Sequence, residues 1–266
     1  DARTVEAAGG KVYVGRDSSV LGVTLILTRL PEGHPLRDKR VRQALNYAVD
    51  KDGIIKSVLF GLAQRSTAPI APEFFGYTKI GGYDYDPAKA KQLLQEAGAT
   101  NLSLKIIHPT GRYLQDAQAT QAIGGNLRDV GVTVETTTSD WPTYLATVLV
   151  TPEKVTLDGY FVGLASYFLD AVHATTVMSK RGWPPNGFGA SHYSNPRVEE
   201  LLDRAAADVN RDAREKAYHE ALRIVWDDAP WIFLWEQKFP IVHSAKVKGI
   251  GSLPIEKFQA VYAEPA

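Results

Sequence analysis

The most constraining feature of the sequence is a pair of short strand-like runs, at residues 102–107 and 132–138, which flank one helix-length segment at residues 113–130. Two strands joined through a single helix form a right-handed crossover and pair in parallel. A third apolar run at residues 159–164 supplies another strand. The spacing therefore predicts an α/β fold, with a mixed sheet flanked by helices.

Amphipathic helices with well-marked starts surround these strands. Asp50 offers an N-cap, and Asp86 and Asn195 are each followed by proline, which suits the first position of a helix. The apolar residues that follow recur at helical spacing, as in Ala90, Leu93, Leu94 and Ala97. We therefore expect helices after each of these caps, and a further amphipathic helix over residues 218–225.

Two more strand-like runs, at residues 20–28 and 231–238, bracket all of this material. We expect them to lie close together and to connect the main body to a small terminal subdomain. In the second run Trp231, Phe233 and Trp235 alternate with apolar residues, so both faces are apolar, as in a buried strand. The sequence contains no internal repeat, and a second independent domain is not expected.

Composition excludes several classes of function. Thirty basic and thirty acidic side chains give a formal charge of zero, so no overall field attracts the chain to nucleic acid or to anionic lipid. The absence of cysteine excludes disulfides, thiolate catalysis and Cys-ligated metals. The longest apolar stretches are too short to cross a bilayer. No signal-peptide pattern follows Asp1, so we expect that segment to be missing from this sequence.

The sequence also lacks the common catalytic and nucleotide-binding motifs. It contains no G-x-S-x-G elbow, no G-x-G-x-x-G loop and no Walker loop. Its six histidines occur in neither HxH nor HExxH spacing, so we assign no metal ligands and no cofactor. The basic cluster at residues 37–42 is interpreted as the solvated face of an amphipathic helix that begins at Asp38.

Several segments resemble a known family. Residues 35–50 read PLRDKRVRQALNYAVD and resemble a segment typical of family 5 bacterial solute-binding proteins, the dipeptide, oligopeptide and nickel binders. The segments at residues 85–98, 193–196 and 228–232 follow in the order and spacing of that family. The resemblance covers nearly the whole chain and corresponds to the second lobe of such a protein.

This resemblance implies a periplasmic-binding-protein-like lobe of type II. The implied function is that of the substrate-binding component of an ABC importer, which captures a peptide-like or other small polar solute in a cleft between two lobes. It implies a periplasmic or extracytoplasmic monomer that works with permease and ATPase subunits in other chains. Residues 20–243 would form the second lobe with both hinge crossings. Residues 1–19 and 244–266 would belong with the first lobe, whose larger part should precede this sequence.

The candidate ligand-binding residues lie in loops and near the second hinge crossing. The loop after the strand at residues 159–164 corresponds to the ligand-facing loop of the family. A Gly/Pro-rich loop at residues 182–189 carries aromatic residues that, if exposed, could contact a ligand. The predicted ligand-binding residues are Ser166, Tyr167, Asp170, His173, Trp183 and Trp235, with Asn186 and Phe188 as further candidates. The structural alternatives are a capping role for Asp170, loop packing for Tyr167 and Trp183, and core packing for Trp235.

Two other functions compete with solute capture. A soluble α/β enzyme domain would place convergent reactive groups at the carboxyl ends of its strands, and a docking module would expose a large apolar patch. Within the solute-binding hypothesis, Ser166 stands where the resemblance places an aspartate for the ligand's ammonium group. We therefore expect that the full-length protein is not a typical dipeptide binder.

Overall fold

The computed structural model describes residues 2–28, 30–165, 168–253 and 257–266, and its centre is a six-stranded sheet in the order β2-β6-β1-β5-β3-β4. The two strands β3 and β4 are parallel to each other and β3 is parallel to β5, whereas β1 runs antiparallel to both β5 and β6. The prediction of a mixed sheet with a parallel crossover pair is therefore confirmed. The six strands are β1 (Gly10–Leu25), β2 (Ala63–Arg65), β3 (Ser103–Pro109), β4 (Thr133–Ser139), β5 (Gly159–Leu164) and β6 (Trp231–Ser244).

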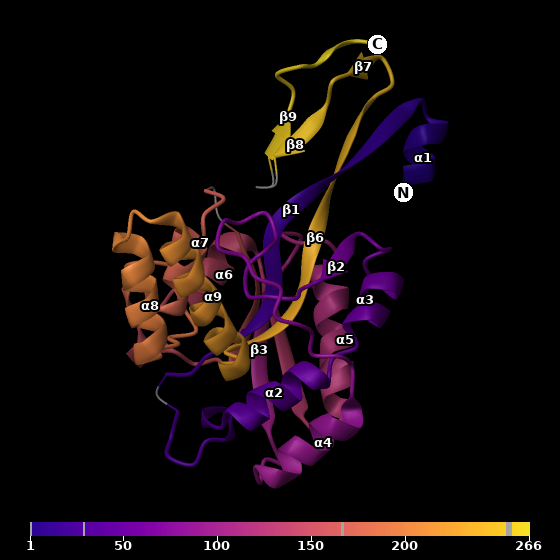
Figure 1. The fold of residues 1–266 in the computed structure, drawn as a ribbon. Coiled ribbons are helices and arrows are strands. Elements are labelled where there is room, and N and C mark those ends of the chain that lie inside the picture. Colours follow the sequence, from indigo (N-terminus) through magenta and orange to yellow (C-terminus); the bar gives the residue numbers. More distant parts are fainter. Residues whose placement is uncertain (1, 29, 166–167, 254–256) are drawn as a thin grey trace.

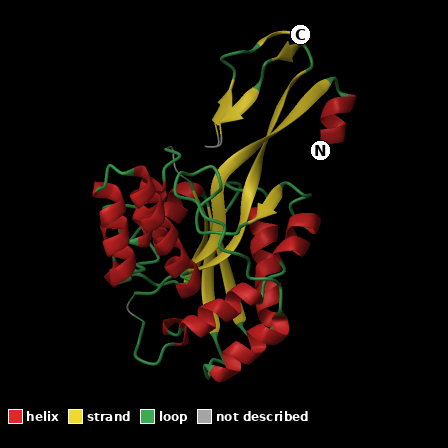
Figure 2. Ribbon diagram, viewed as in Figure 1, coloured by secondary structure: helices red, strands yellow, loops and turns green. Residues whose placement is uncertain are grey.

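Helices cover both faces of this sheet (Figures 1 and 2). The longer ones are α2 (Lys39–Tyr47), α3 (Lys51–Ser57), α4 (Pro87–Glu96), α5 (Asp116–Asp129), α6 (Trp141–Val148), α8 (Pro196–Ala207) and α9 (Arg211–Asp228). The predicted caps are confirmed, because Asp50, Asp86 and Asn195 each accept a hydrogen bond from a first-turn backbone N–H. Helix α6 was not predicted, although Asp140 caps it in the same way.

The core is divided by the sheet, because successive side chains of a strand point to opposite faces. Leu21 and Val23 of β1, and Ile232 of β6, pack under α2, α4 and α5. Trp231 and Phe233 of β6 point to the other face, where they pack against α8 and α9. The 231–235 run is thus buried on both faces, as its sequence predicts.

Strands β1 and β6 are long enough to leave the body of the fold as a paired ribbon (Figure 1). Their pairing runs from Gly10 opposite Ser244 to Thr24 opposite Trp231, which confirms that the two bracketing segments lie side by side. The far end of the ribbon carries α1 (Ala2–Ala7) and the short strands β7 (Val247–Lys248), β8 (Gly251–Leu253), β9 (Lys257–Gln259) and β10 (Glu264–Pro265).

A β-bulge in this ribbon changes the direction of one predicted site residue. Leu21 pairs with Trp235 and the next residue, Gly22, pairs with Phe233, so Leu234 is an extra residue in β6. The bulge turns Trp235 to the same face as Leu21, away from the face of Trp231 and Phe233. Strict alternation along the strand would have placed all three aromatic side chains together.

Candidate ligand-binding site

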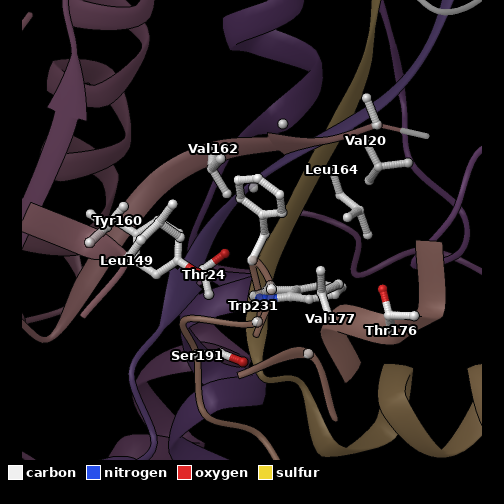
Figure 3. A pocket seen from close by; sticks show the side chains of 18 of the residues that line it. Val20, Thr24, Leu149, Tyr160, Val162, Leu164, Thr176, Val177, Ser191 and Trp231 are labelled. Carbon is white, nitrogen blue, oxygen red and sulfur yellow. The ribbon is translucent and has the colours of Figure 1, made fainter. Parts of the chain in front are cut away.

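A pocket of about 620 Å³ lies on the face of the sheet that carries Trp231 and Phe233. Strands β1 and β5 form its floor, α6 forms one wall, and the segment at residues 172–191 forms the opposite wall. The side chains labelled in Figure 3 surround this space and come from β1, β5 and β6, from residue 149 just after α6, and from residues 176–191. The volume falls within the range of small-molecule sites, which measure roughly 300–1,000 Å³.

The alternation of β5 explains which of its residues reach the pocket. Tyr160, Val162 and Leu164 line it, whereas Phe161, between them, points into the core on the opposite face. In β1 the same alternation places Val20 and Thr24 on this side, and Leu21 also reaches the lining.

The hydroxyl groups deep in this pocket are engaged within the protein. Tyr144 donates a hydrogen bond of 2.7 Å to the carbonyl of Phe161, and Ser191 Oγ accepts one of 3.1 Å from the backbone of Tyr193. Burial raises the pKa of Tyr160, against the smaller opposing effect of a hydrogen bond with Thr24. Burial likewise raises the pKa of Tyr144. These phenols stay neutral at physiological pH.

Among the described residues, the charged side chains that line the pocket are Arg112 and Arg181. The guanidinium of Arg112 lies over the rings of Tyr113, at 4.7 Å, and Trp141, at 5.3 Å. Arg181 is largely exposed and forms an ion pair with Asp203. Within the described ranges, no aspartate or glutamate lines this pocket. The described part of the lining therefore favours an anionic or neutral group.

Asp170 occupies the start of α7 (Ala171–Ala174) and lies outside the lining of the pocket. Its Oδ1 accepts a hydrogen bond of 2.9 Å from the backbone of Val172, and its Oδ2 accepts one of 2.8 Å from Arg214. The capping alternative thus has direct support. Ser166 and Tyr167 lie outside the described residues, and so does the side chain of His173.

The two predicted tryptophans also lie outside the lining of this pocket. Trp183 donates a hydrogen bond of 3.0 Å to the carbonyl of Tyr193 and packs edge-on against His192, so it holds its own loop. Trp235 is 1% exposed, because the bulge turns it into the core beside Phe161. Asn186 and Phe188 do line the pocket, and Phe188 is 68% exposed.

Sequence reasoning missed several residues that the fold brings to this site, above all Arg112, Tyr160 and Trp231. Arg112 follows the carboxyl end of β3, where ligands of α/β sheets commonly bind, so that rule would have identified it. The wall formed by α6 was signalled by Asp140 and by the proline at position 142, a cap and an early helix proline. Among the described residues no cluster of three or more metal-binding side chains occurs, and no helix is long and apolar enough to span a membrane.

Comparison with known proteins gives one family and a consistent set of relatives. The sequence model of the bacterial extracellular solute-binding proteins, family 5 Middle, matches residues 2–182. The glutathione-binding protein GsiB of Pectobacterium atrosepticum is 32% identical over 227 residues, which make up 83% of this chain and 43% of that protein. GsiB of Escherichia coli K12 is 27% identical over 222 residues, again 83% of this chain and 43% of that protein.

Solved structures share the same fold. DppA of Helicobacter pylori, a periplasmic binding protein in complex with the peptide STSA, superposes with a TM-score of 0.83 and 25% identity, over 95% of this chain and 48% of that one. NikZ of Campylobacter jejuni, in complex with Ni(L-His), superposes with a TM-score of 0.77 and 23% identity, over 94% of this chain and 52% of that one. This chain spans about half the length of the relatives it matches.

Proposed function

Because this chain belongs to the family 5 bacterial extracellular solute-binding proteins, we propose that the protein is the substrate-binding component of an ABC importer and that this chain supplies one of its two lobes. The observation that carries the proposal is the pocket at the carboxyl ends of β3 and β5, next to the paired strands β1 and β6 that leave the body. The family and the relatives named above are solute-binding proteins, not enzymes.

The division of the chain into parts of two lobes is part of this proposal. Residues 20–243 form the second lobe, and residues 1–19 and 244–266 belong with the first. The ribbon beyond the body supports this division, because Tyr13, Val14 and Val242 are exposed there on the surface of paired strands. Apolar side chains in such a place favour a covering partner, and the relatives are about twice as long as this chain.

Closure about the ribbon would trap the ligand. A ligand that contacts both lobes stabilises the closed state, since those contacts exist only there. The pairing of β1 with β6 shifts register between Arg16 and Val20, at the exit from the body. An irregular stretch of this kind interrupts the ladder and bends the strand, which suits a hinge.

The solute that best fits the pocket is a peptide-like acid. Arg112 places a cation in the lining of the pocket, over two aromatic rings, and no described acidic side chain lines the pocket. Relatives described as binding glutathione or the peptide STSA agree with this class. The partners would be permease and ATPase subunits in other chains, and the location periplasmic or extracytoplasmic, as in the family.

Calorimetry on the intact protein tests this function. The intact protein is titrated with glutathione, a free dipeptide and an oligopeptide, and thermal unfolding is followed in parallel. We expect at least one of these ligands to bind and to raise Tm by mass action. The 266-residue chain alone should bind weakly or not at all, because half of a cleft does not surround the ligand. Tight binding to this chain alone, or turnover of a peptide, would contradict the proposal.

A further inference from the structure

We infer that the inner part of the pocket is a subsite for an uncharged, apolar group of the solute, of the aromatic or branched aliphatic kind. The inference rests on the proposed function and specifies its substrate as an acid with one apolar arm. The inner chamber is lined by Thr24, Leu149, Tyr160, Val162, Val177 and Trp231 (Figure 3).

Burial separates this inner chamber from the mouth of the pocket. Thr24 and Tyr160 are 4% exposed, Trp231 8% and Val177 9%, and Leu149 and Val162 are partly buried, whereas Phe188 is 68% exposed. The inner chamber thus belongs to the interior of the lobe, where a ligand group would lose most of its contact with water.

The charge of the lining decides what enters. None of the six side chains that line the inner chamber is charged, and Arg181, elsewhere in the lining, is largely exposed and pairs with Asp203. A carboxylate or ammonium placed among these six side chains would lose its hydration and meet no opposite charge on any of them, which disfavours its entry. An apolar group loses nothing of this kind on entry.

The hydroxyls of the inner chamber do not change this selection. Thr24 and Tyr160 are cross-strand partners in β1 and β5, so their two side chains lie next to each other on this face of the sheet. What remains for a ligand is the ring surface of Tyr160 and Trp231 and the methyl groups of Val162, Val177 and Leu149. Aromatic surfaces and methyl groups bind aryl or branched alkyl groups through burial of apolar area.

Methyl NMR on this chain tests the inference with small probes. Spectra labelled at valine and leucine methyls are recorded during titration with 3-phenylpropionate, acetate and 2-phenylethylammonium. We expect 3-phenylpropionate to shift the signals of Val162, Val177 and Leu149 in a saturable way, and acetate to leave them unchanged. Burial of one such group increases affinity about tenfold to a hundredfold. Binding in the millimolar range is therefore the expected result for 3-phenylpropionate and is enough to support the inference.

Matched variants distinguish an effect at the inner chamber from a general effect of the substitution on the protein. Val162→Trp fills the inner chamber and should weaken 3-phenylpropionate at least tenfold, whereas Val209→Trp makes the same change at a position that is 99% exposed and should not. Val162→Ala enlarges the inner chamber and should shift preference at least threefold towards 3-(2-naphthyl)propionate. This gain serves as the test if the tryptophan variant does not fold, because mere loss of structure would not produce it.

Three results would overturn the inference: shifts of equal size with acetate, no shift at the methyls of Val162, Val177 and Leu149, or equal weakening by the two tryptophan variants. The probes are not peptides and are observed directly at the inner chamber, so the outcome does not depend on whether the intact protein binds peptides. If the intact protein binds peptides but 3-phenylpropionate does not shift the inner-chamber methyl signals, the apolar subsite is refuted and the proposed function still stands.

Discussion

Asp170 and Arg214 form an ion pair, with 2.8 Å between Oδ2 and Nη2, and each side chain keeps about a quarter of its surface exposed. The other oxygen of Asp170 caps α7 through the backbone N–H of Val172. Both oxygens therefore have partners within the lobe, and a ligand ammonium would have to compete with an arginine for the same carboxylate.

Asp170→Asn should lower the free energy of unfolding by about 1 kcal/mol, because it removes the ion pair while an amide oxygen can still cap the helix. Asp170→Ala, which loses the cap as well, should cost about twice as much. Chemical denaturation measures both values. Ligand affinity of the intact protein should change less than twofold in Asp170→Asn, and a tenfold loss would return the anchoring role to Asp170.

The intact protein should bind free dipeptides and their amino-blocked analogues with similar affinity, or bind neither. Ser166 stands where the family resemblance places an aspartate, and a neutral hydroxyl does not match a charge-assisted hydrogen bond to a desolvated ammonium. Calorimetric titration with both series decides the matter. A preference for the free ammonium of more than tenfold, lost in Asp170→Asn, would refute the argument from Ser166.

Arg112→Gln should weaken a carboxylate-bearing ligand between tenfold and a thousandfold, since the variant loses a partly buried ionic contact. The measurement is titration of the intact protein with a peptide acid and with its methyl ester, and only the acid should be affected. Equal losses for acid and ester would show that Arg112 shapes the pocket without pairing with the ligand.

Trp235→Ala should destabilise the lobe by about 3–5 kcal/mol, because it leaves a large cavity in the core. Trp235→Phe should recover much of that loss. Ligand affinity at a temperature where both variants are folded should match that of the unsubstituted protein. If Trp235→Phe were as stable as the parent but bound ligand tenfold more weakly, the predicted ligand contact of Trp235 would hold instead.

Lys51 should make stability rise with pH between about pH 7 and pH 10. Burial lowers its pKa from 10.5 to about 7, and its Nζ donates to the carbonyls of Asn46 and Tyr83. In this window the unfolded chain holds the proton and the native state does not, so raising the pH favours the native state, by a total on the order of a few kcal/mol.

The measurement is the free energy of unfolding across this pH range for the parent, for Lys51→Met and for the exposed control Lys56→Met. The free energy of unfolding of the parent minus that of Lys51→Met should increase as the pH rises. The control should follow the parent throughout. A difference that stays constant with pH would mean that Lys51 keeps its proton in the native state.

Local sequence signals predicted the elements of this fold well, because the forces behind them act between near neighbours. Asp50, Asp86 and Asn195 cap helices through contacts of two or three residues, and the apolar spacing that follows each cap chooses the buried face. The strand at residues 159–164 has the same bounds in the structure. Helix α6 was not predicted because its apolar face is short, although its cap was present in the sequence.

The sequence by itself determined the α/β class, the helix starts and the family. Apolar periodicity and short-range hydrogen bonds encode the class and the helix starts. A series of matching segments along the chain indicated the family. Only the tertiary structure decided which side chains share the pocket. Trp235 entered the core instead of the pocket face because Leu234 is bulged against Leu21, and Arg112, Tyr160 and Trp231 met because distant strands pair in one register. Register and bulges depend on the packing of the whole sheet, and no local stretch of sequence specifies them.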